Sequence, residues 1–141
     1  MSLLDIVNAL TTDGGPVATK SLEKLSRNSP LSMACALEII HRLRTGTPDI
    51  RKALELEYRF TSRAMENGDF LEGIRAAIID KDKSPKWRHE LGKVPAVDMA
   101  AMLRPVTGDK LTFEREESAM KIGFIGLGNM GAPMAANLAA A

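Results

Sequence analysis

Apolar residues in this chain recur every three or four positions, and proline, glycine and capping residues divide the pattern into short segments. This spacing places the apolar side chains on one face of an α-helix. Up to about residue 118, apolar and polar residues almost never alternate as they do in a half-buried β-strand. We therefore expect an all-helical region, with helices within residues 2–13, 16–27, 30–45, 49–67, 69–79 and 97–103.

Local start signals define most of these helices. Ser2 and Asp5 form a weak capping box at the beginning of the first one. Pro16 and Pro30 stand at the first position of the second and third, where the missing N–H would have no partner in any case. The last segment, 97–103, is short and ends before Pro105.

The longest predicted helix has a broad apolar face. Gly46 is a candidate for the left-handed residue that ends the preceding helix, and Thr47-Pro48-Asp49 predicts a cap followed by proline. The face of the new helix comprises Ile50, Ala53, Leu54, Phe60, Thr61 and Ala64. Glu57 lies beside this face without a second carboxylate, so we expect an ion pair with Arg59 or Arg63 rather than a catalytic acid.

The stretch from Asp69 to Trp87 contains the most clearly bounded helix. Asp69 is expected to cap it, with Glu72 reaching back as the partner in a capping box. Its apolar face comprises Phe70, Ile74, Ala77 and Ile78. Alternating charge follows from Asp80 to Lys83, and Trp87 is expected to be a packing anchor. Because no strands are predicted beneath this face, we expect it to dock on a larger body or to drive self-association.

The composition excludes several classes of partner. The formal net charge is +1, and acidic and basic residues are interleaved, so neither nucleic acid nor an anionic membrane surface is an expected partner. No apolar run approaches the roughly 20 residues that span a bilayer. The chain starts without the features of a signal peptide and has one cysteine, which favours a reducing, cytoplasmic setting.

The remaining reactive side chains predict neither a nucleophile nor a metal site. Cys35 has apolar neighbours and no adjacent basic residue, which is typical of a structural thiol. His41 and His89 lack the spacing of metal ligands. Met99 and Met102 are expected in the core.

Four segments of the sequence occur in the same order as similar segments in a known protein family. They are NSPLS at Asn28–Ser32, LELEYRFTSR at Leu54–Arg63, DFLEGIRAAIIDKDKSPKW at Asp69–Trp87, and LTFE at Leu111–Glu114. Together they resemble the C-terminal part of the 3-hydroxyisobutyryl-CoA hydrolases, a branch of the crotonase (enoyl-CoA hydratase/isomerase) superfamily. The resemblance implies helices that pack over a catalytic β-core or a neighbouring subunit. It also implies that the catalytic residues lie in an N-terminal portion, so none is assigned here.

The same resemblance suggests one contact with substrate. The family acts on a coenzyme A thioester and requires no further cofactor, and helical tails of the superfamily help to close the coenzyme A site. Lys81, Lys83 and Lys86, followed by Arg88, are therefore candidates to face the phosphates. The alternative is a solvated turn whose charges are balanced by Asp80, Asp82 and Glu90.

The last residues resemble a second family. Lys121–Ala141 predicts a strand, a glycine turn and the start of a helix, with the spacing G-x-G-x-x-G. The dinucleotide fingerprint comprises Gly126, Leu127, Gly128, Asn129, Met130 and Gly131. The amino-acid sequence of this segment resembles the N-terminus of 3-hydroxyisobutyrate dehydrogenases, which use NAD. Because no second strand and no ribose-binding acid follow, we expect negligible NAD affinity.

We therefore expect a mainly α chain with three parts. Residues 1–106 form a crotonase-like C-terminal helical region, 107–119 a linker, and 120–141 the first β-α unit of a Rossmann fold. The leading hypothesis is a hydrolase fragment that is inactive alone. The alternatives are a fragment of a dehydrogenase or of a hydrolase-dehydrogenase fusion, and a non-catalytic helical module that docks on a crotonase-type partner.

Overall fold

The structure, a computed structural model, describes residues 1–47, 49–108 and 111–113. The chain divides into two units, Met1–Leu111 and Thr112–Ala141, and the helical fold below is that of the first. The β-α unit expected at 120–141 lies outside the described residues, as does the fingerprint from Gly126 to Gly131. The prediction for that part of the chain stays a prediction.

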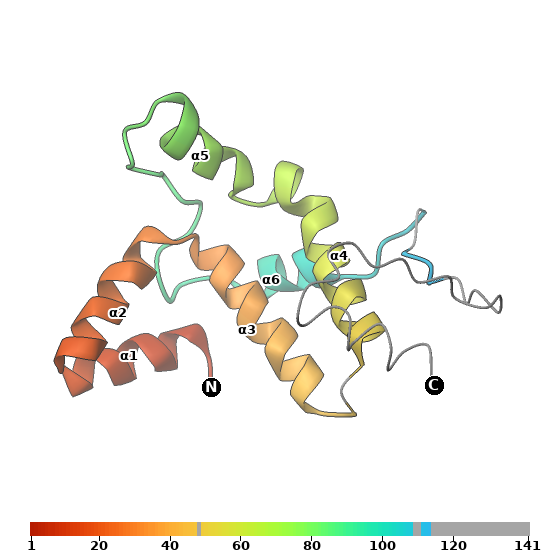
Figure 1. Cartoon of the computed structure of the whole chain (residues 1–141), viewed down its shortest axis with the longest axis horizontal. Helices are drawn as coiled ribbons and strands as arrows, with labels where there is room; N and C mark the ends of the chain where they lie inside the picture. Colours follow the sequence, from red (N-terminus) through yellow and green to blue (C-terminus); the bar gives the residue numbers. More distant parts are fainter. Residues whose placement is uncertain (48, 109–110, 114–141) are drawn as a thin grey trace, which may run out of the picture. The chain divides into compact units, whose positions relative to one another are not determined.

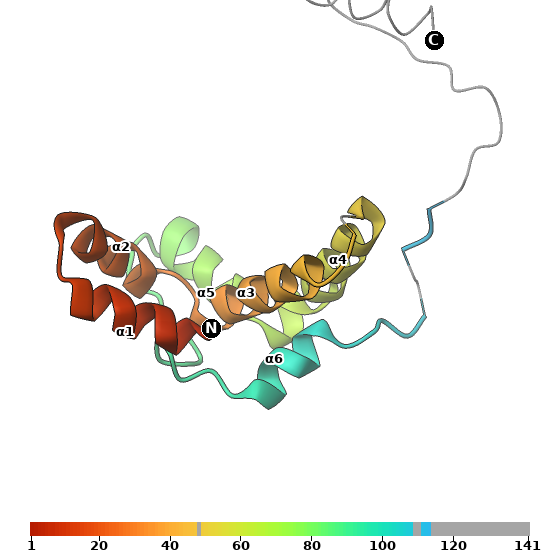
Figure 2. The ribbon, with the colours of Figure 1, turned by 90° about the horizontal axis from the view of Figure 1, so that it is seen from below.

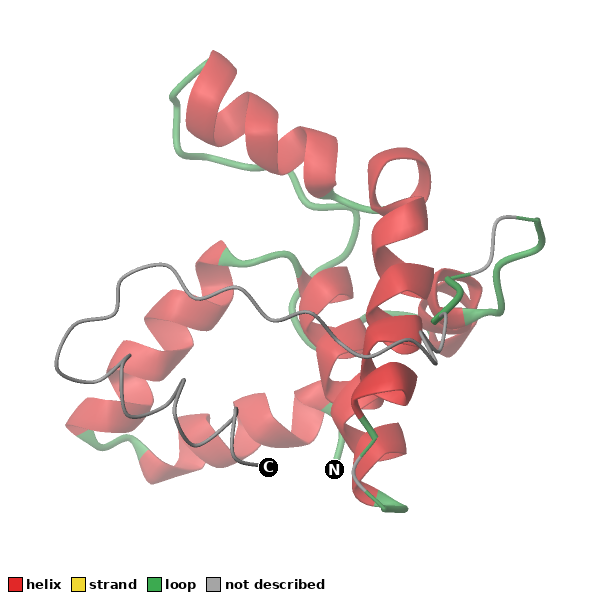
Figure 3. Cartoon of the chain, turned by 45° about the vertical axis from the view of Figure 1, so that its right-hand side comes forward, coloured by secondary structure: helices red, strands yellow, loops and turns green. Residues whose placement is uncertain are grey.

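The first unit consists of helices joined by short loops and by one long connection, residues 80–95 (Figure 1). They are α1 Leu3–Asp13, α2 Pro16–Arg27, α3 Pro30–Arg44, α4 Ile50–Asn67, α5 Phe70–Ile74, the π-helix η1 Arg75–Ile79, and α6 Ala96–Leu103. Each predicted helix is present at its expected place, and the described residues contain no strand (Figure 3). The π-helix is the one element that the apolar spacing did not predict; it continues α5 without a break.

Two of the predicted caps form as expected. The Ser2 hydroxyl accepts a hydrogen bond from the Asp5 N–H at 3.2 Å, and the Asp5 carboxylate accepts one from the Ser2 N–H at 2.7 Å. At the other end of α1, Gly14 has a left-handed backbone with φ +61°, which glycine adopts without steric cost. Pro30 opens α3, and the Ser29 hydroxyl caps it by accepting from the Ser32 N–H.

The predicted signals between α3 and α4 were wrong in detail. Gly46 is not left-handed; α3 ends at Arg44, and the hydroxyl of the C-cap residue Thr45 donates to the Arg42 carbonyl at 3.0 Å. Helix α4 is capped by Asp49 instead of Thr47, because the Asp49 carboxylate accepts from the Arg51 N–H at 2.9 Å. In both cases a nearby oxygen satisfies a helix-end group that the sequence pattern assigned to another residue.

The helices of the first unit pack around α3. Helices α1 and α2 form a hairpin at one end, and α3 contacts α1, α4 and α6 (Figures 1 and 2). Helix α6 contacts both α3 and α4. The core therefore lies where α3, α4 and α6 meet, and the α5–η1 segment, which contacts α4 through α5, extends from it.

The core is small. It comprises the buried residues Leu31, Cys35, Met102 and Leu103, with Ile39, Phe60, Val94 and Met99 packed against them. The predicted core positions Met99 and Met102 are thus confirmed. Arg63 joins α4 to the end of α6, because its guanidinium donates to the carbonyls of Met102, Arg104 and Pro105 at 2.9–3.2 Å.

The apolar face predicted for α4 is confirmed only in part. Ala64 is buried and Phe60 packs against the core, as predicted. Ile50 and Leu54 are 71% and 40% exposed, and Leu56, which the prediction left out, is buried, because α4 contacts both α3 and α6. The ion pair predicted for Glu57 does not form. Arg59 pairs instead with Glu55 one turn earlier, and Arg63 is occupied by the backbone carbonyls after α6.

Candidate functional site

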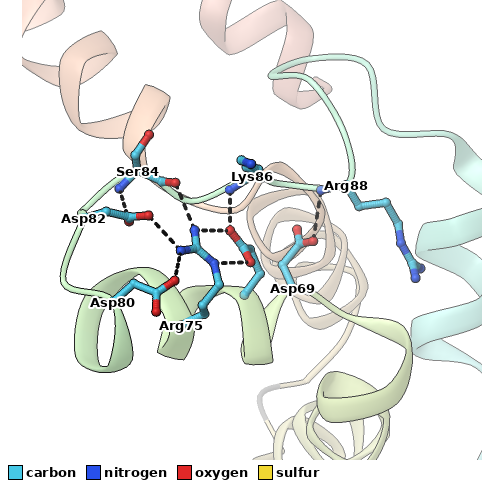
Figure 4. Close-up of polar contacts among 8 residues, drawn as sticks. Asp69, Arg75, Asp80, Asp82, Ser84, Lys86 and Arg88 are labelled. Carbon is cyan, nitrogen blue, oxygen red and sulfur yellow. Dashed lines mark hydrogen bonds and ion pairs between the residues drawn. The ribbon is translucent and has the colours of Figure 1, made fainter.

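The chain reverses direction after η1 and returns alongside α5 (Figure 4). The Asp80 N–H donates to the Arg75 carbonyl at 2.8 Å, and the Lys83 N–H donates to the Ala76 carbonyl at 3.1 Å. Lys81 and Lys83 both have left-handed backbones, with φ +56° and +53°. This conformation is uncommon for residues other than glycine, asparagine and aspartate, so the tight reversal must be held by other contacts.

Arg75 supplies those contacts. Its guanidinium donates twice to Glu72 at 2.8 and 2.9 Å, and once each to Asp80 at 2.5 Å and Asp82 at 2.7 Å. A further bond reaches the Ser84 carbonyl at 3.2 Å. All five N–H donors therefore have acceptors, and Figure 4 shows the acidic side chains converging on the guanidinium from both sides of the reversal.

The electrostatics of this Arg75 cluster are well defined. The Arg75 hydrogen bonds, together with the Lys86 N–H, lower the pKa of Glu72 to about 2. The same guanidinium lowers the pKa of Asp82, and the three carboxylates raise that of Arg75. Glu72 and Asp82 are therefore ionised at neutral pH, where neither is suited to act as a general acid.

The three candidate lysines belong to the reversal and to the segment that follows it. Lys81, Lys83 and Lys86 are exposed. The carboxylates expected to balance them have other partners, since Asp80 and Asp82 pair with Arg75 and Glu90 pairs with Lys93 at 2.7 Å. Across residues 1–47, 49–108 and 111–113, no carboxylate forms an ion pair with these ammonium groups. Arg88 donates its guanidinium to the Asn67 carbonyl.

The predicted capping box of α5 was wrong. The Asp69 carboxylate makes no cap bond but accepts from the Ser29 hydroxyl at 2.6 Å and the Arg88 N–H at 3.2 Å. Glu72, its expected partner, bonds Arg75 and the Lys86 N–H. Arg75 and partners from other segments have replaced the predicted cap bonds, and Asp69, only 7% exposed, links the starts of α3 and α5 to the returning segment.

An apolar groove of about 290 Å³ lies beside this junction. Its lining includes Phe60, Phe70, Ile74, Ile78 and Trp87. Trp87 is half-buried against α5, where a Cβ atom at Gly73 would lie 3.6 Å from its ring, and this confirms its predicted packing role.

The other candidate residues from the sequence form neither a reactive thiol nor a metal site within the described residues. Burial raises the pKa of the Cys35 thiol to about 11, so it is protonated at neutral pH, as expected for a structural cysteine. Within the described part of the chain, no three side chains of metal-binding type come together. None of the described helices has the length and hydropathy needed to cross a bilayer.

Residues 1–103 match the Enoyl-CoA hydratase/isomerase family. The chain belongs to this family. A crystal structure of an enoyl-CoA hydratase from Rhodobacter sphaeroides 2.4.1 is 48% identical, with a TM-score of 0.75, over 80% of this chain and 34% of that one. The helical region of this family member is thus a crotonase-like one, as the sequence predicted.

Several curated relatives of this family member are 3-hydroxyisobutyryl-CoA hydrolases. The protein from Gallus gallus is 42% identical over 88 residues, which are 62% of this chain and 22% of the relative. The Homo sapiens protein is 31% identical over 110 residues, which are 77% of this chain and 28% of the relative. The chain therefore spans about a quarter of their length. Both relatives are named as mitochondrial, in contrast to the cytoplasmic setting predicted from the sequence.

The end of the chain has a separate similarity. Residues 121–141 match the NAD binding domain of 6-phosphogluconate dehydrogenase, which is consistent with a dinucleotide fingerprint there. Sequence reasoning located the lysines and this fingerprint but missed Arg75 and the linking role of Asp69. The usable signal was an arginine with acids three residues before it and five and seven after it, just ahead of a chain reversal.

Proposed function

We propose that this chain is the C-terminal helical part of a 3-hydroxyisobutyryl-CoA hydrolase, joined to the first β-α unit of a 3-hydroxyisobutyrate dehydrogenase. The similarity to the hydrolases from Gallus gallus and Homo sapiens supports the assignment of the helical part to a hydrolase. The match at residues 121–141 supports the second half. The two reactions are consecutive: water cleaves the thioester to coenzyme A and 3-hydroxyisobutyrate, and the dehydrogenase oxidises this product in valine breakdown.

We further propose that the chain alone does not hydrolyse the thioester. The reaction needs N–H donors aimed at the developing oxyanion and an acid or base near its working pKa. In the described residues the best-organised carboxylates are those around Arg75, and Glu72 and Asp82 have lowered pKa values there. The test is a thioesterase assay of the purified chain with 3-hydroxyisobutyryl-CoA. Turnover above the spontaneous rate would overturn the proposal.

The proposed contact with substrate is the exposed set Lys81, Lys83 and Lys86, which would face the phosphates of coenzyme A. Support comes from the pairing pattern, because Arg75 and Lys93 hold the neighbouring acids and leave the three ammonium groups available to an anion. Titration of coenzyme A into the chain, compared with a K81A/K83A/K86A variant, tests this contact. Equal affinities would refute it.

The dehydrogenase alternative concerns residues 121–141 only. A single β-α unit leaves both edges of its strand unpaired, so we propose that NAD does not bind with useful affinity. A calorimetric titration of NAD against the chain measures this directly, and a micromolar dissociation constant would favour the fusion alternative.

The third alternative is a non-catalytic helical module that docks on a crotonase-type partner. The observation in its favour is the exposed apolar set on α5 and η1, where Phe70, Leu71, Ile78 and Ile79 are each more than half exposed. Co-expression with a hydrolase trimmed to its catalytic core, followed by size-exclusion chromatography, tests docking. A stable complex that hydrolyses the thioester would identify the module as an interaction partner, and separate elution would exclude it.

A further inference from the structure

We propose that two copies of this chain form a dimer in which the α5–η1 segment of each copy lies in a groove between α3 and α4 of the other. The proposal goes beyond the proposed function, because it requires neither coenzyme A nor hydrolysis. It names the surface that receives the exposed apolar side chains of α5 and η1, and it limits the assembly to two copies.

The receiving groove lies where α3 and α4 run side by side in opposite directions, and its volume is about 420 Å³ (Figure 1). Its apolar wall on α3 has the spacing i, i+3, i+4 and i+7, which places these side chains on one helical face. The lining includes Ala36, Ile39, Ile40 and Leu43 from α3, with Glu57 and Phe60 from α4. Ile39 and Phe60 also pack against the core, whereas Ile40 is 50% exposed. The groove therefore presents apolar surface to solvent.

The α5–η1 segment fits this groove in length and in character. It is continuously helical from Phe70 to Ile79 and so about 14 Å long. The groove follows α3 from Ser32 to Leu43, which is about 16 Å. Phe70 and Ile78 are 53% and 64% exposed, and they lie on the same side of the segment, where both line the groove of about 290 Å³. A helix that lays an apolar face into an apolar groove is a common mode of recognition.

The inserted segment and the receiving groove belong to one continuous surface. Ser32 and Phe60 line the groove between α3 and α4, and they also line the groove that includes Phe70 and Ile78. In a dimer with two-fold symmetry, the same surface of each copy meets its equivalent on the other. Each copy can therefore insert its own segment and receive that of its partner. The contact forms twice, which doubles the apolar area that is removed from water.

Charge favours a second copy as the occupant. Glu57 lines the groove, is exposed, and forms no ion pair within the described residues. Lys81 and Lys83 follow η1 directly and are exposed, and no carboxylate of the described part of the chain pairs with them. With the C-terminal end of η1 beside Glu57, an unpaired acid meets unpaired lysines across the interface. The same chain thus supplies both the apolar and the charged complement of the groove.

The first test measures the mass of the 141-residue chain by sedimentation equilibrium over a range of concentrations. We expect one monomer–dimer equilibrium with an upper limit of twice 15.3 kDa. I40E places a carboxylate in the receiving groove, where it would lose water, so dimerisation should weaken about tenfold or more. V17E, which places the same charge on an exposed residue of α2, should change dimerisation by less than about twofold.

Charge reversal tests the orientation of the inserted segment. E57K should weaken dimerisation about tenfold, because it places like charge beside Lys81 and Lys83. Combining E57K with K81E, or with K83E, restores opposite charges and the formal net charge of +1. At least one of these double variants should therefore regain dimerisation to within about threefold of the unaltered chain. E66K adds the same charge to α4 at an exposed position outside the groove and should leave dimerisation unchanged.

Each outcome decides one part of the proposal. A chain that stays monomeric, or whose mass exceeds two copies, overturns the dimer. A dimer that persists in I40E and E57K but is lost in F70E/I78K overturns the groove between α3 and α4 as the receiving surface. Failure of both double variants to recover overturns the placement of the lysines beside Glu57. Circular dichroism monitors folding, and if I40E unfolds, E57K and its double variants decide, because Glu57 is exposed.

Discussion

Asp69 shows how much a single side chain does in this small fold. Its buried carboxylate receives the Ser29 hydroxyl and the Arg88 N–H, from segments 40 and 19 residues away in the chain. Neither donor is on the helix that Asp69 precedes. At the residue scale, the structure therefore depends on polar side chains that form hydrogen bonds with distant segments instead of capping the neighbouring helix.

Replacing Asp69 tests this dependence. D69A leaves two partly buried donors without an acceptor, and we expect it to lower the free energy of unfolding by about 2 kcal/mol. Urea denaturation followed by circular dichroism measures the change. The matched control is E66A, an exposed position in α4 that should change stability by less than about 0.5 kcal/mol. Equal effects of the two variants would contradict the linking role.

The Cys35 thiol gives a prediction with a pH dependence. Its pKa in the folded chain is about 11, above the ordinary value of 9.0, because burial disfavours the thiolate. The folded chain thus holds the thiol proton more tightly, and this contribution to stability is complete below pH 9 and lost as the pH rises toward 11.

Two measurements check this. Labelling of Cys35 by a thiol reagent at pH 8 should be much slower in the folded chain than in urea. The decrease in the free energy of unfolding between pH 8 and pH 10.5 should be smaller in C35A than in the unaltered chain. Rapid labelling without denaturant would show that the thiol is accessible after all.

At the scale of elements, glycines on α5 and in the loop before α6 should respond in opposite directions. A Cβ at Gly73 would only make ordinary contact with the Trp87 ring at 3.6 Å, so G73A should stabilise the chain by about 0.5–1 kcal/mol through helix propensity. Gly92 has φ +78°, and a Cβ there would lie 3.0 Å from Leu4 Cδ1. G92A should therefore destabilise by about 1 kcal/mol or more. Thermal unfolding of the two variants side by side gives the signs, and a stabilising G92A would refute the assigned geometry.

The same scale shows which features a sequence can predict. Helix positions were predictable because their signals are local, as with Ser2 and Asp5 or the prolines that open α2 and α3. The cap of α5 was not predictable from local signals, because Asp69 and Glu72 accept hydrogen bonds from Ser29 and the Lys86 N–H, in segments that only folding brings near. The buried face of α4 was likewise decided by helices packed on two of its sides.

The lysines of the candidate site were predictable from the sequence, whereas the role of Arg75 was not, because it depends on contacts that only folding creates. Exposed lysines after an apolar helix can be recognised in the sequence, and the four-segment resemblance suggested a ligand for them. The role of Arg75 depends on the reversal at 80–84, which brings acids five and seven residues away onto one guanidinium. Helical periodicity contains no signal for that arrangement, because it assumes that the helix continues.

At the scale of the molecule, the exposed apolar set on α5 and η1 should cause self-association. Phe70, Leu71, Ile78 and Ile79 are 52–69% exposed and lie on one continuous helical segment. We expect an average mass that rises with concentration in light scattering after size-exclusion chromatography, and F70E/I78K should lower it. V17K, which alters a still more exposed residue on α2, should not. A chain that stays monomeric at all concentrations would contradict this prediction.

The α5–η1 segment and the segment that returns alongside it have few neighbours, so we expect them to unfold locally before the core does. Residues 70–88 bond one another through Arg75 and join the rest of the fold chiefly at Asp69, Arg88 and Trp87. Such a segment should open as one cooperative unit while the α3, α4 and α6 core stays closed. In amide hydrogen exchange, its N–H groups should therefore exchange together, and earlier than those of α3. D69A should accelerate that exchange without altering the order.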